Sequence, residues 1–379
     1  MKVYLDNAAT TPLDAEVAKE MYKVMCEEFG NPSSTHSHGR IVRTIIEDSR
    51  KKVAQLLNCT PGEIFFTSGG TEADNMAIRK SVEDKGVKNI ITSAIEHHAV
   101  SHTIEELAHQ GKVNLHLVNL LPNGHIDISH LEELLANHSN VLVSLMHANN
   151  EIGNLLDIEK VGELCKQHNA LFHCDTVQTI GHYSFDLQKL NIDFLACAAH
   201  KFNGPKGVGF IYINHTTKIH PFITGGAQER NMRGGTENVY GIVGLAKAME
   251  IAYASLDEKK NQITGLKNYM IGKLNELVPG INFNGDAQGN SLYTVLNVNF
   301  PPTPIAEMIL FKLDIAGISA SGGSACSSGS NVGSHVLAAL KVDPNRPSVR
   351  FSFGKHNTTQ EIDYVLEQLQ KMLGYSSMN

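Results

Sequence analysis

The sequence predicts an α/β fold, with a large domain around a mostly parallel central sheet and a smaller α+β domain. Short apolar runs alternate with helical patterns along the first two thirds of the chain, which is typical of parallel strands buried between helices. The 379 residues also exceed what one ordinary core needs, so about two domains are expected. In chain order the apolar runs are "EIFFTSG", "NIITSAI", "VNLHLVNL", "NVLVSLMHAN", "ALFHCD", "DFLACAA" and "GVGFIYIN".

Two helices are predicted before the first of these runs. Asp14 is placed to cap the first helix, which carries apolar residues at helical spacing and ends at "GNP", residues 30–32. The second helix shows the same spacing over the following residues. The apolar positions are Val17, Met21, Val24 and Met25 in the first helix, and Val42, Ile45, Ile46, Val53, Leu56 and Leu57 in the second.

After "GVGFIYIN" the pattern changes to that of a smaller domain. A helix over residues 239–255 leads into "LDEKKNQITGLKNYMIGKLNEL", a long helix expected to cross to the second domain. Beyond it come "INFNG", "TVLNVNF", a helix near 304–316, "SVRFSFG" and a final helix. We therefore expect a large domain of residues 15–256, and a small domain of residues 1–14 with 257–379 that carries a loop over 319–334.

Composition narrows the class of protein. The net charge of −7 at pH 7 argues against a nucleic-acid or anionic-membrane binder. No apolar run approaches the roughly 18 residues of a membrane span, and the N-terminus lacks the apolar core of a signal peptide. The six cysteines lack zinc-site spacing, so no metal is expected. We expect a cytoplasmic protein whose cysteines are mostly free thiols.

The stretch "SASGGSACSSGSNVGS", residues 319–334, has the composition of a flexible linker but contains Cys326. An exposed thiol is a chemical liability, so two interpretations stand. Either the cysteine is incidental, or a mobile loop carries a reactive sulfur. Cys165, Cys174 and Cys197 differ from it, because they lie in apolar segments and are expected to be buried.

Polar residues at strand ends are the first candidates for a site, because ligands of open α/β sheets bind at the carboxyl ends of strands. Ser68 to Thr71, "SGGT", lead from a strand into a helix and offer N–H groups and the helix dipole to a phosphate. A capping box that uses Glu72 explains this stretch equally well. The P-loop spacing is missing.

Two further strand ends carry charged residues. Asp175 follows "ALFHCD", with Gln178 three residues later, although such an aspartate also caps turns. Lys201 comes just after "DFLACAA", where a lysine must be paired, extended to solvent or used chemically, and a desolvated lysine can form a Schiff base. A phosphate cradle, an aspartate for a pyridinium nitrogen and a Schiff-base lysine are together what pyridoxal 5'-phosphate requires.

The chain resembles the cysteine desulfurases of the NifS/IscS type, which belong to class V of the fold-type I pyridoxal-phosphate enzymes. No single motif is specific, but their order and spacing together are. The matching motifs run from end to end of the chain: "YLDNAATTP", "FTSGGTEADN", "EHHAV", "NNEIG", "HCDTVQ", "HKFNGPKGVG", "RGGTEN", "GSACSSGS" and "RPSVRFSFG".

The resemblance implies roles around the cofactor ring. Lys201 holds pyridoxal 5'-phosphate as a Schiff base and later moves protons, and Asp175 pairs with the ring nitrogen and keeps it protonated. Gln178 hydrogen-bonds the phenolic oxygen, with Asn150 beside it and within reach of the substrate. His97, the first histidine of "EHHAV", stacks on the ring and serves as an acid or base.

The resemblance also implies how the cofactor phosphate and the substrate carboxylate are bound. Gly70, Thr71 and His200 bind the cofactor phosphate, and Thr236 reaches in from a second subunit. Arg350 offers a bidentate fork to the substrate carboxylate. A surface ion pair is the alternative explanation for Arg350, and its position within an apolar strand disfavours it.

The resemblance answers the question that Cys326 raises. It implies that this thiol attacks the sulfur of a bound cysteine, leaving alanine and an enzyme persulfide. A mobile loop suits a group that must reach a buried cofactor and then an acceptor. The resemblance also implies L-cysteine as substrate and a homodimer. The loop length matches the long-loop group, so we expect a sulfur acceptor such as an iron–sulfur scaffold or a tRNA-thiolation relay.

Three positions depart from the family pattern. Ala198 stands where a serine or threonine usually offers a hydroxyl to the phosphate, residues 331–333 read "NVG" instead of "LEP", and Cys174 replaces an aliphatic residue. Other functions remain open at this point. They are a relative that acts on selenocysteine, a class V enzyme that does not use Cys326, and a silent sulfur-binding scaffold subunit.

Overall fold

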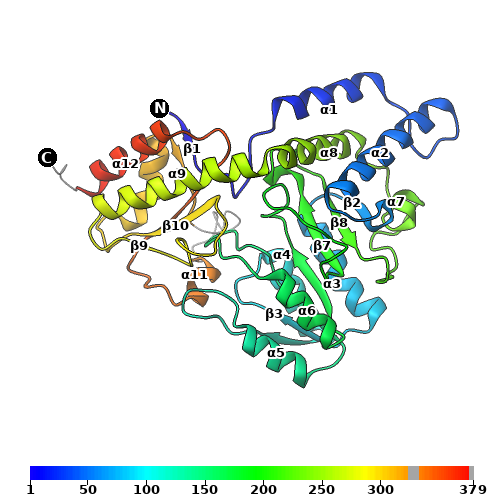
Figure 1. Ribbon diagram of the computed structural model, residues 1–379, viewed down its shortest axis with the longest axis horizontal. Coiled ribbons are helices and arrows are strands. Elements are labelled where there is room, and N and C mark those ends of the chain that lie inside the picture. Colours follow the sequence, from blue (N-terminus) through cyan, green and yellow to red (C-terminus); the bar gives the residue numbers. More distant parts are fainter. Residues whose placement is uncertain (323–332, 375–379) are drawn as a thin grey trace.

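The computed structural model describes residues 1–322 and 333–374 (Figure 1). Cys326 and most of its loop lie outside these residues. A larger part, which contains a twisted sheet, lies beside a smaller part that contains the first residues of the chain and its last helix. The long helix α9 (Leu256–Leu277) runs from one part to the other.

The larger part is built on a seven-stranded sheet. β8 runs antiparallel to both of its neighbours, β2 and β7, while the pairs from β7 to β4 are parallel. The predicted, mostly parallel sheet is thereby confirmed. In sheet order the strands are β2 (Ile64–Thr67), β8 (Gly209–Ile213), β7 (Phe194–Ala198), β6 (Leu171–Asp175), β5 (Val141–Ser144), β3 (Asn89–Thr92) and β4 (Asn114–Leu117).

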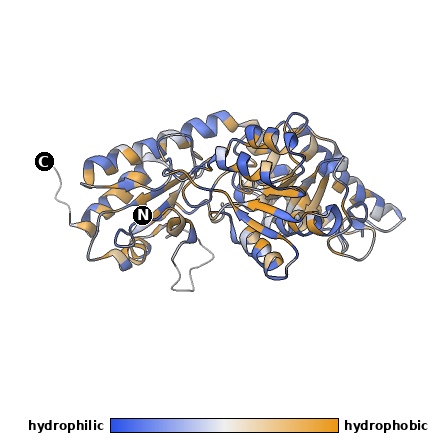
Figure 2. Cartoon of the chain, turned by 90° about the horizontal axis from the view of Figure 1, so that it is seen from below, coloured by the Kyte–Doolittle hydropathy of each residue, from blue (hydrophilic) through white to orange (hydrophobic). Residues whose placement is uncertain are grey.

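Helices cover both faces of this sheet because apolar side chains point to both. On β7, Leu195 and Cys197 pack with α2 and α8, whereas Phe194 and Ala196 pack with α3. Figure 2 shows the resulting apolar interior of the larger part. The helices of this part are α1 (Ala15–Glu27), α2 (Ser37–Leu56), α3 (Gly70–Lys85), α4 (His98–His109), α5 (Ile128–Asn137), α6 (Ile158–Gln167), α7 (Gln228–Asn231) and α8 (Val239–Ala254), with short 3-10 turns η1 (Pro61–Glu63) and η2 (Ala199–Lys201).

The predicted start of the first helix is confirmed. The Asp14 side chain accepts a hydrogen bond of 2.9 Å from the Glu16 N–H, as an N-cap does. The helix ends at Glu27, three residues before the predicted stop at "GNP". Val17 and Val24 are buried against α8, as the apolar spacing predicts.

The smaller part has its own apolar core, formed by residues 3–5 and residues 263–369. From these separate cores we propose the division into residues 15–256 and residues 1–14 with 257–379. Within the described residues, α8 and α9 together pass a length and hydropathy test for a membrane span but bend by 74°, and no single helix passes. The elements of the smaller part are β1 (Val3–Tyr4), β9 (Asn282–Phe283), β10 (Val295–Asn299), η3 (Ala306–Met308), α10 (Ile309–Ile315), β11 (Ile318–Ser319), α11 (His335–Ala339), β12 (Ser348–Ser352) and α12 (Thr359–Leu373).

Candidate active site

A cavity of about 260 Å³ lies at the carboxyl ends of β5, β6 and β7 and at the N-terminus of α3. This is where open α/β sheets bind ligands. Thr236 is exposed and lines a different cavity. Cys326 lies outside the described residues. The predicted site residues that line the cavity are Gly70, Thr71, His97, Asn150, Asp175, Gln178, His200, Lys201 and Arg350.

The N-terminus of α3 forms one end of the cavity. No side chain caps the helix at Gly69, so its first N–H groups are available to an anion. A Cβ atom at Gly70 would lie 2.5 Å from Val177 Cγ2, so only glycine lets the helix approach this closely. Glu72 does accept a hydrogen bond of 2.9 Å from the Ser68 N–H. This contact is not a capping box, because the N-cap is Gly69 and Glu72 bonds to the residue before it. The expected capping box is therefore wrong, and phosphate binding at this helix start stays a prediction.

Lys201 enters the cavity from η2, directly after β7. Its Nζ atom donates to the carbonyl oxygens of Ala8 at 2.6 Å and Ala9 at 2.9 Å. Gln178 Nε2 donates to the same Ala8 oxygen at 3.0 Å. The N-terminal segment thus forms a wall of the cavity, a role that the motif "YLDNAATTP" did not reveal.

Asp175 ends β6 and is buried at the cavity wall. Burial raises the pKa of its carboxyl to about 6, although the Val177 N–H and the Lys201 charge lower it. Two more buried carboxyls lie near it, those of Asp74 and Glu96. Burial and the neighbouring carboxyls raise the pKa of Asp74 well above its usual value, and burial raises that of Glu96 to about 8. Both shifts favour the protonated carboxyl, and Asp175, which accepts the Val177 N–H and lies near the Lys201 charge, is the candidate anion for a cationic ring.

Sequence reasoning missed Asp74, because nothing in "TEADN" marks one carboxyl as buried. Its Oδ1 atom lies 3.3 Å from Nε2 of the buried His173, and neither atom has a well-formed hydrogen bond. The other ring nitrogen of His173 lies 2.9 Å from Ser144 Oγ. Burial lowers the pKa of His173 to about 3, so the ring is neutral. The raised pKa of Asp74 favours a neutral carboxyl beside this neutral imidazole.

Asp74→Asn is expected to retain the cofactor. Its stability relative to that of the wild type should increase as the pH rises. A carboxyl whose pKa is raised by folding stabilises less above its unfolded pKa of about 3.9, because the folded state keeps a proton that the unfolded state has lost. Asparagine does not titrate, so the thermal midpoint of the variant relative to that of the wild type should rise between pH 5 and pH 8. Asp175→Asn is the control and should weaken cofactor binding. If Asp74→Asn also weakens it, Asp74 works as an anion.

His97 caps α4 and lines the cavity. Its Nδ1 atom accepts a hydrogen bond of 3.1 Å from the Ala99 N–H. Burial, helped by the Lys201 charge, lowers the pKa of His97 to about 4. The ring is therefore neutral and, because Nδ1 is an acceptor, Nε2 carries the proton. The helix cap thus sets the tautomer that the cavity receives.

Arg350 lies on β12 and is buried, so it is not part of a surface ion pair. It donates to the Asn150 carbonyl oxygen and to Asp6 Oδ1, each at 2.8 Å. Its Nε atom is buried and has no partner among the described residues. An unsatisfied guanidinium donor in a cavity favours an anionic ligand, such as a substrate carboxylate.

Glu151 and His335 line the same cavity and were also missed. The carboxylate of Glu151 accepts a hydrogen bond of 2.5 Å from Ser334 Oγ, and His335 Nε2 lies 2.9 Å from the Glu96 carbonyl oxygen. Both contacts hold the chain immediately after the loop that contains Cys326. Sequence gave no signal for them beyond the position of Glu151 in "NNEIG".

The residues present fit pyridoxal 5'-phosphate. The open N-terminus of α3 provides an anion site that only a glycine permits, and the buried carboxylate of Asp175 suits a protonated ring nitrogen. The lysine amine of Lys201 lies in the same cavity. The unsatisfied Arg350 Nε provides a separate donor for a substrate carboxylate.

Ala198→Ser is expected to bind pyridoxal 5'-phosphate more tightly, by about tenfold if a full charge-assisted hydrogen bond forms. Ala198 ends β7 in extended backbone conformation and lies 3.8 Å from a Cβ built at Gly70, so a hydroxyl there faces the start of α3. The rate of cofactor release from both proteins in the same phosphate-free buffer measures the effect. Equal rates would show that another donor already fills this place.

Comparisons with known proteins agree with this geometry. Residues 3–365 match the aminotransferase class-V family. A protein from Dictyoglomus turgidum named cysteine desulfurase IscS is 42% identical over 98% of this chain and 94% of its own length. One of the same name from Methanosarcina thermophila is 44% identical over 98% and 92%. Among solved structures, a NifS-like protein superposes with a TM-score of 0.91 at 38% identity, covering 99% of this chain and all of its own. A structure titled SspA in complex with cysteine gives a TM-score of 0.81 at 30% identity, covering 94% and 100%.

Proposed function

The chain belongs to the class-V aminotransferase family, and we infer that it is an L-cysteine desulfurase dependent on pyridoxal 5'-phosphate. It converts L-cysteine to L-alanine and provides sulfur for iron–sulfur cluster biosynthesis. The single observation that carries this function is one cavity that gathers Lys201, Asp175, the open start of α3 and the unsatisfied Arg350.

The residues divide the work of binding. Gly70, Thr71 and His200 would hold the cofactor phosphate, and Asp175 the ring nitrogen. Gln178 and Asn150 lie where they can bind the phenolic oxygen. When bound, the cofactor supplies an electron sink for the carbanion at Cα of the substrate.

Four side chains act on the substrate. Arg350 binds its carboxylate through the free guanidinium donor and so orients Cα. Lys201 Nζ takes the Cα proton, and the neutral His97 offers its Nε2–H as a hydrogen-bond donor. The Cys326 thiolate attacks the substrate sulfur, so that the Cβ–S bond breaks and an S–S bond forms. Cβ then takes up a proton and Lys201 returns one to Cα, which gives alanine and a persulfide on Cys326.

We propose that the working enzyme is a homodimer. Tyr22 and Met25 on α1 and Phe29 just after the helix are 68%, 50% and 74% exposed, away from the buried Val17 and Val24. An apolar stripe of this kind favours a second copy of the chain as partner. The exposure of Thr236 supports its predicted role in the partner's site.

The acceptor and the compartment are also proposals. An iron–sulfur scaffold protein or a tRNA-thiolation relay would take the persulfide sulfur from Cys326. The cysteines of the described residues are all unpaired, which fits a reducing cytoplasm.

The test is to incubate the cofactor-loaded protein with L-cysteine and a reducing thiol and to quantify alanine and sulfide. We expect the two products in equal amounts. Selenocysteine in parallel tests the alternative substrate, and a much higher kcat/KM for it would replace the proposed one. Formation of a keto acid instead of alanine would indicate a different class V reaction.

A further inference from the structure

The segment 223–238, called the arm from here on, connects β8 to α8 and carries Thr236. Within it Glu229, Arg230 and Asn231 have φ values of 45°, 54° and 65°. Three consecutive non-glycine residues in the left-handed region are costly, because L-residues visit it singly. Such a backbone persists only where its surroundings determine it strongly, and it is often found at functional sites.

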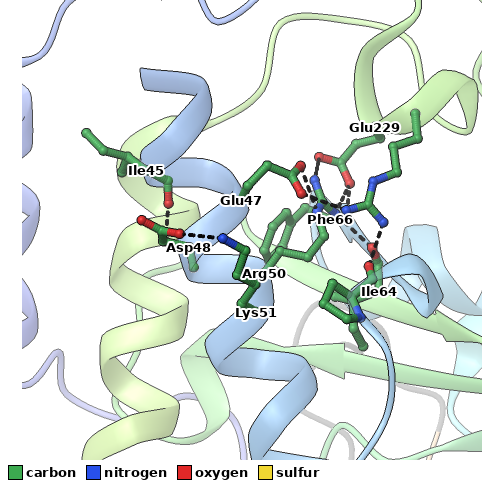
Figure 3. A network of polar contacts seen from close by, with 11 residues as sticks. Ile45, Glu47, Asp48, Arg50, Lys51, Ile64, Phe66 and Glu229 are labelled. Carbon is green, nitrogen blue, oxygen red and sulfur yellow. Dashed lines mark hydrogen bonds and ion pairs between the residues drawn. The ribbon is translucent and has the colours of Figure 1, made fainter. Parts of the chain in front are cut away.

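The first contact that holds the arm is a buried ion pair (Figure 3). Arg50 on α2 donates to the two carboxylate oxygens of Glu229 at 2.7 and 2.8 Å. Both residues are almost fully buried, at 1% and 4% exposure. Glu229 also accepts from the Phe66 N–H at 2.7 Å, and Arg50 donates to the Ile64 carbonyl oxygen at 2.7 Å. The pair therefore joins the arm to β2.

A second ion pair holds the arm at Arg233, five residues before its end. Arg233 contacts the Glu72 carboxylate at 3.0 and 3.2 Å. That carboxylate also accepts from the Ser68 N–H. Ser68 and Glu72 flank Gly70 and Thr71, the predicted phosphate-binding residues. This pair therefore joins the arm to the loop at the start of α3.

Stability alone does not explain these contacts. A buried ion pair is often no more stabilising than apolar residues of similar volume, because two charges must be desolvated. What the two pairs do fix is geometry. They place the exposed Thr236 at the rim of a cavity of about 220 Å³ that Ser68 and Arg233 also line, outside the candidate active site.

We propose that Glu229 and Arg233 are positioning residues that hold Thr236 for the cofactor phosphate of the partner subunit. This inference rests on the proposed function and on the proposed dimer. The same two ion pairs contact β2 and the start of α3 in their own subunit. They therefore connect the phosphate site of one subunit to that of the other, and cofactor retention in one subunit depends on the arm of its partner.

Mixed dimers test this inference. One subunit keeps Lys201 and holds the cofactor, while the other carries Lys201→Ala with or without Glu229→Gln, and different tags isolate the mixed species. The visible absorption of the bound cofactor reports its rate of release. We expect Glu229→Gln in the Lys201→Ala subunit to speed release from its partner by about tenfold, the effect of one lost charge-assisted hydrogen bond. A residue with a merely structural role would affect only its own subunit.

The controls make the result decisive. Arg233→Gln, at a less buried position, replaces Glu229→Gln if that variant fails to fold, and the same acceleration is expected. Glu106→Gln breaks the exposed Arg79–Glu106 ion pair elsewhere on the large domain and should change nothing. If the wild type binds the cofactor but neither variant changes the rate of cofactor release from the partner subunit, this inference alone is overturned. A wild type that binds no cofactor would overturn the proposed function as well.

Discussion

Lys201→Ala is expected to lower L-cysteine desulfurase activity by at least about a thousandfold, since it removes the proposed cofactor attachment and the proposed proton carrier together. The Nζ atom lies in the candidate cavity against the Ala8 and Ala9 carbonyl oxygens. Burial lowers the pKa of His97 to about 4, so this side chain is a weak base and a poor replacement for Lys201 as proton carrier. Alanine production by the variant with excess cofactor measures the loss.

A chemical readout separates loss of attachment from loss of fold. Borohydride treatment of the wild type should fix the cofactor on the peptide that contains Lys201, as mass spectrometry can show. Lys189→Ala is the matched control, because that side chain is 83% exposed, pairs with Asp186 and does not line the cavity. Normal sulfide release by Lys201→Ala would remove this lysine from the mechanism.

The strands could be predicted from the sequence because a buried strand appears as a short apolar run. Their order in the sheet could not, because apolar character does not identify the neighbouring strand. "GVGFIYIN" has the same composition as the parallel strands, yet β8 runs antiparallel to β7. The cause is the connection between β7 and β8, which contains η2 and no crossover helix.

Site residues could be predicted where strand ends and motifs coincide, as at Asp175 and Lys201. They could not be predicted where the properties of a side chain depend on its burial in the fold. Asp74 is one carboxyl among many in the sequence, and only the fold places it beside Asp175 and His173. Contacts between distant segments were also invisible, such as the ion pair of Arg350 with Asp6. The arm is a third case, because the pairing of Arg50 with Glu229 joins residues far apart in the chain.

The Cys326 prediction stands on the sequence, and the described cysteines support it by exclusion. Burial raises the pKa of the thiols of Cys165, Cys174 and Cys197 above the ordinary value, and that of Cys59 to about 12. A thiolate is the nucleophile in sulfur transfer, so these four residues are poor candidates at neutral pH. Cys26 is exposed, but it lies on α1 and does not line the candidate cavity.

Cys326→Ala is therefore expected to bind the cofactor normally and to lower persulfide formation by at least about a hundredfold, as removal of a nucleophile does. The measurement is mass spectrometry of the protein after one turnover with L-cysteine, without a reducing thiol. Cys26→Ala is the matched control and should form persulfide at the wild-type rate. Because Lys201 Nζ donates to the Ala8 and Ala9 carbonyl oxygens and the Arg350 guanidinium to Asp6 and the Asn150 carbonyl oxygen, the cofactor spectrum of Cys326→Ala should match that of the wild type. A persulfide on a different cysteine, with Cys326 unmodified, would show that the reactive sulfur lies elsewhere in the chain.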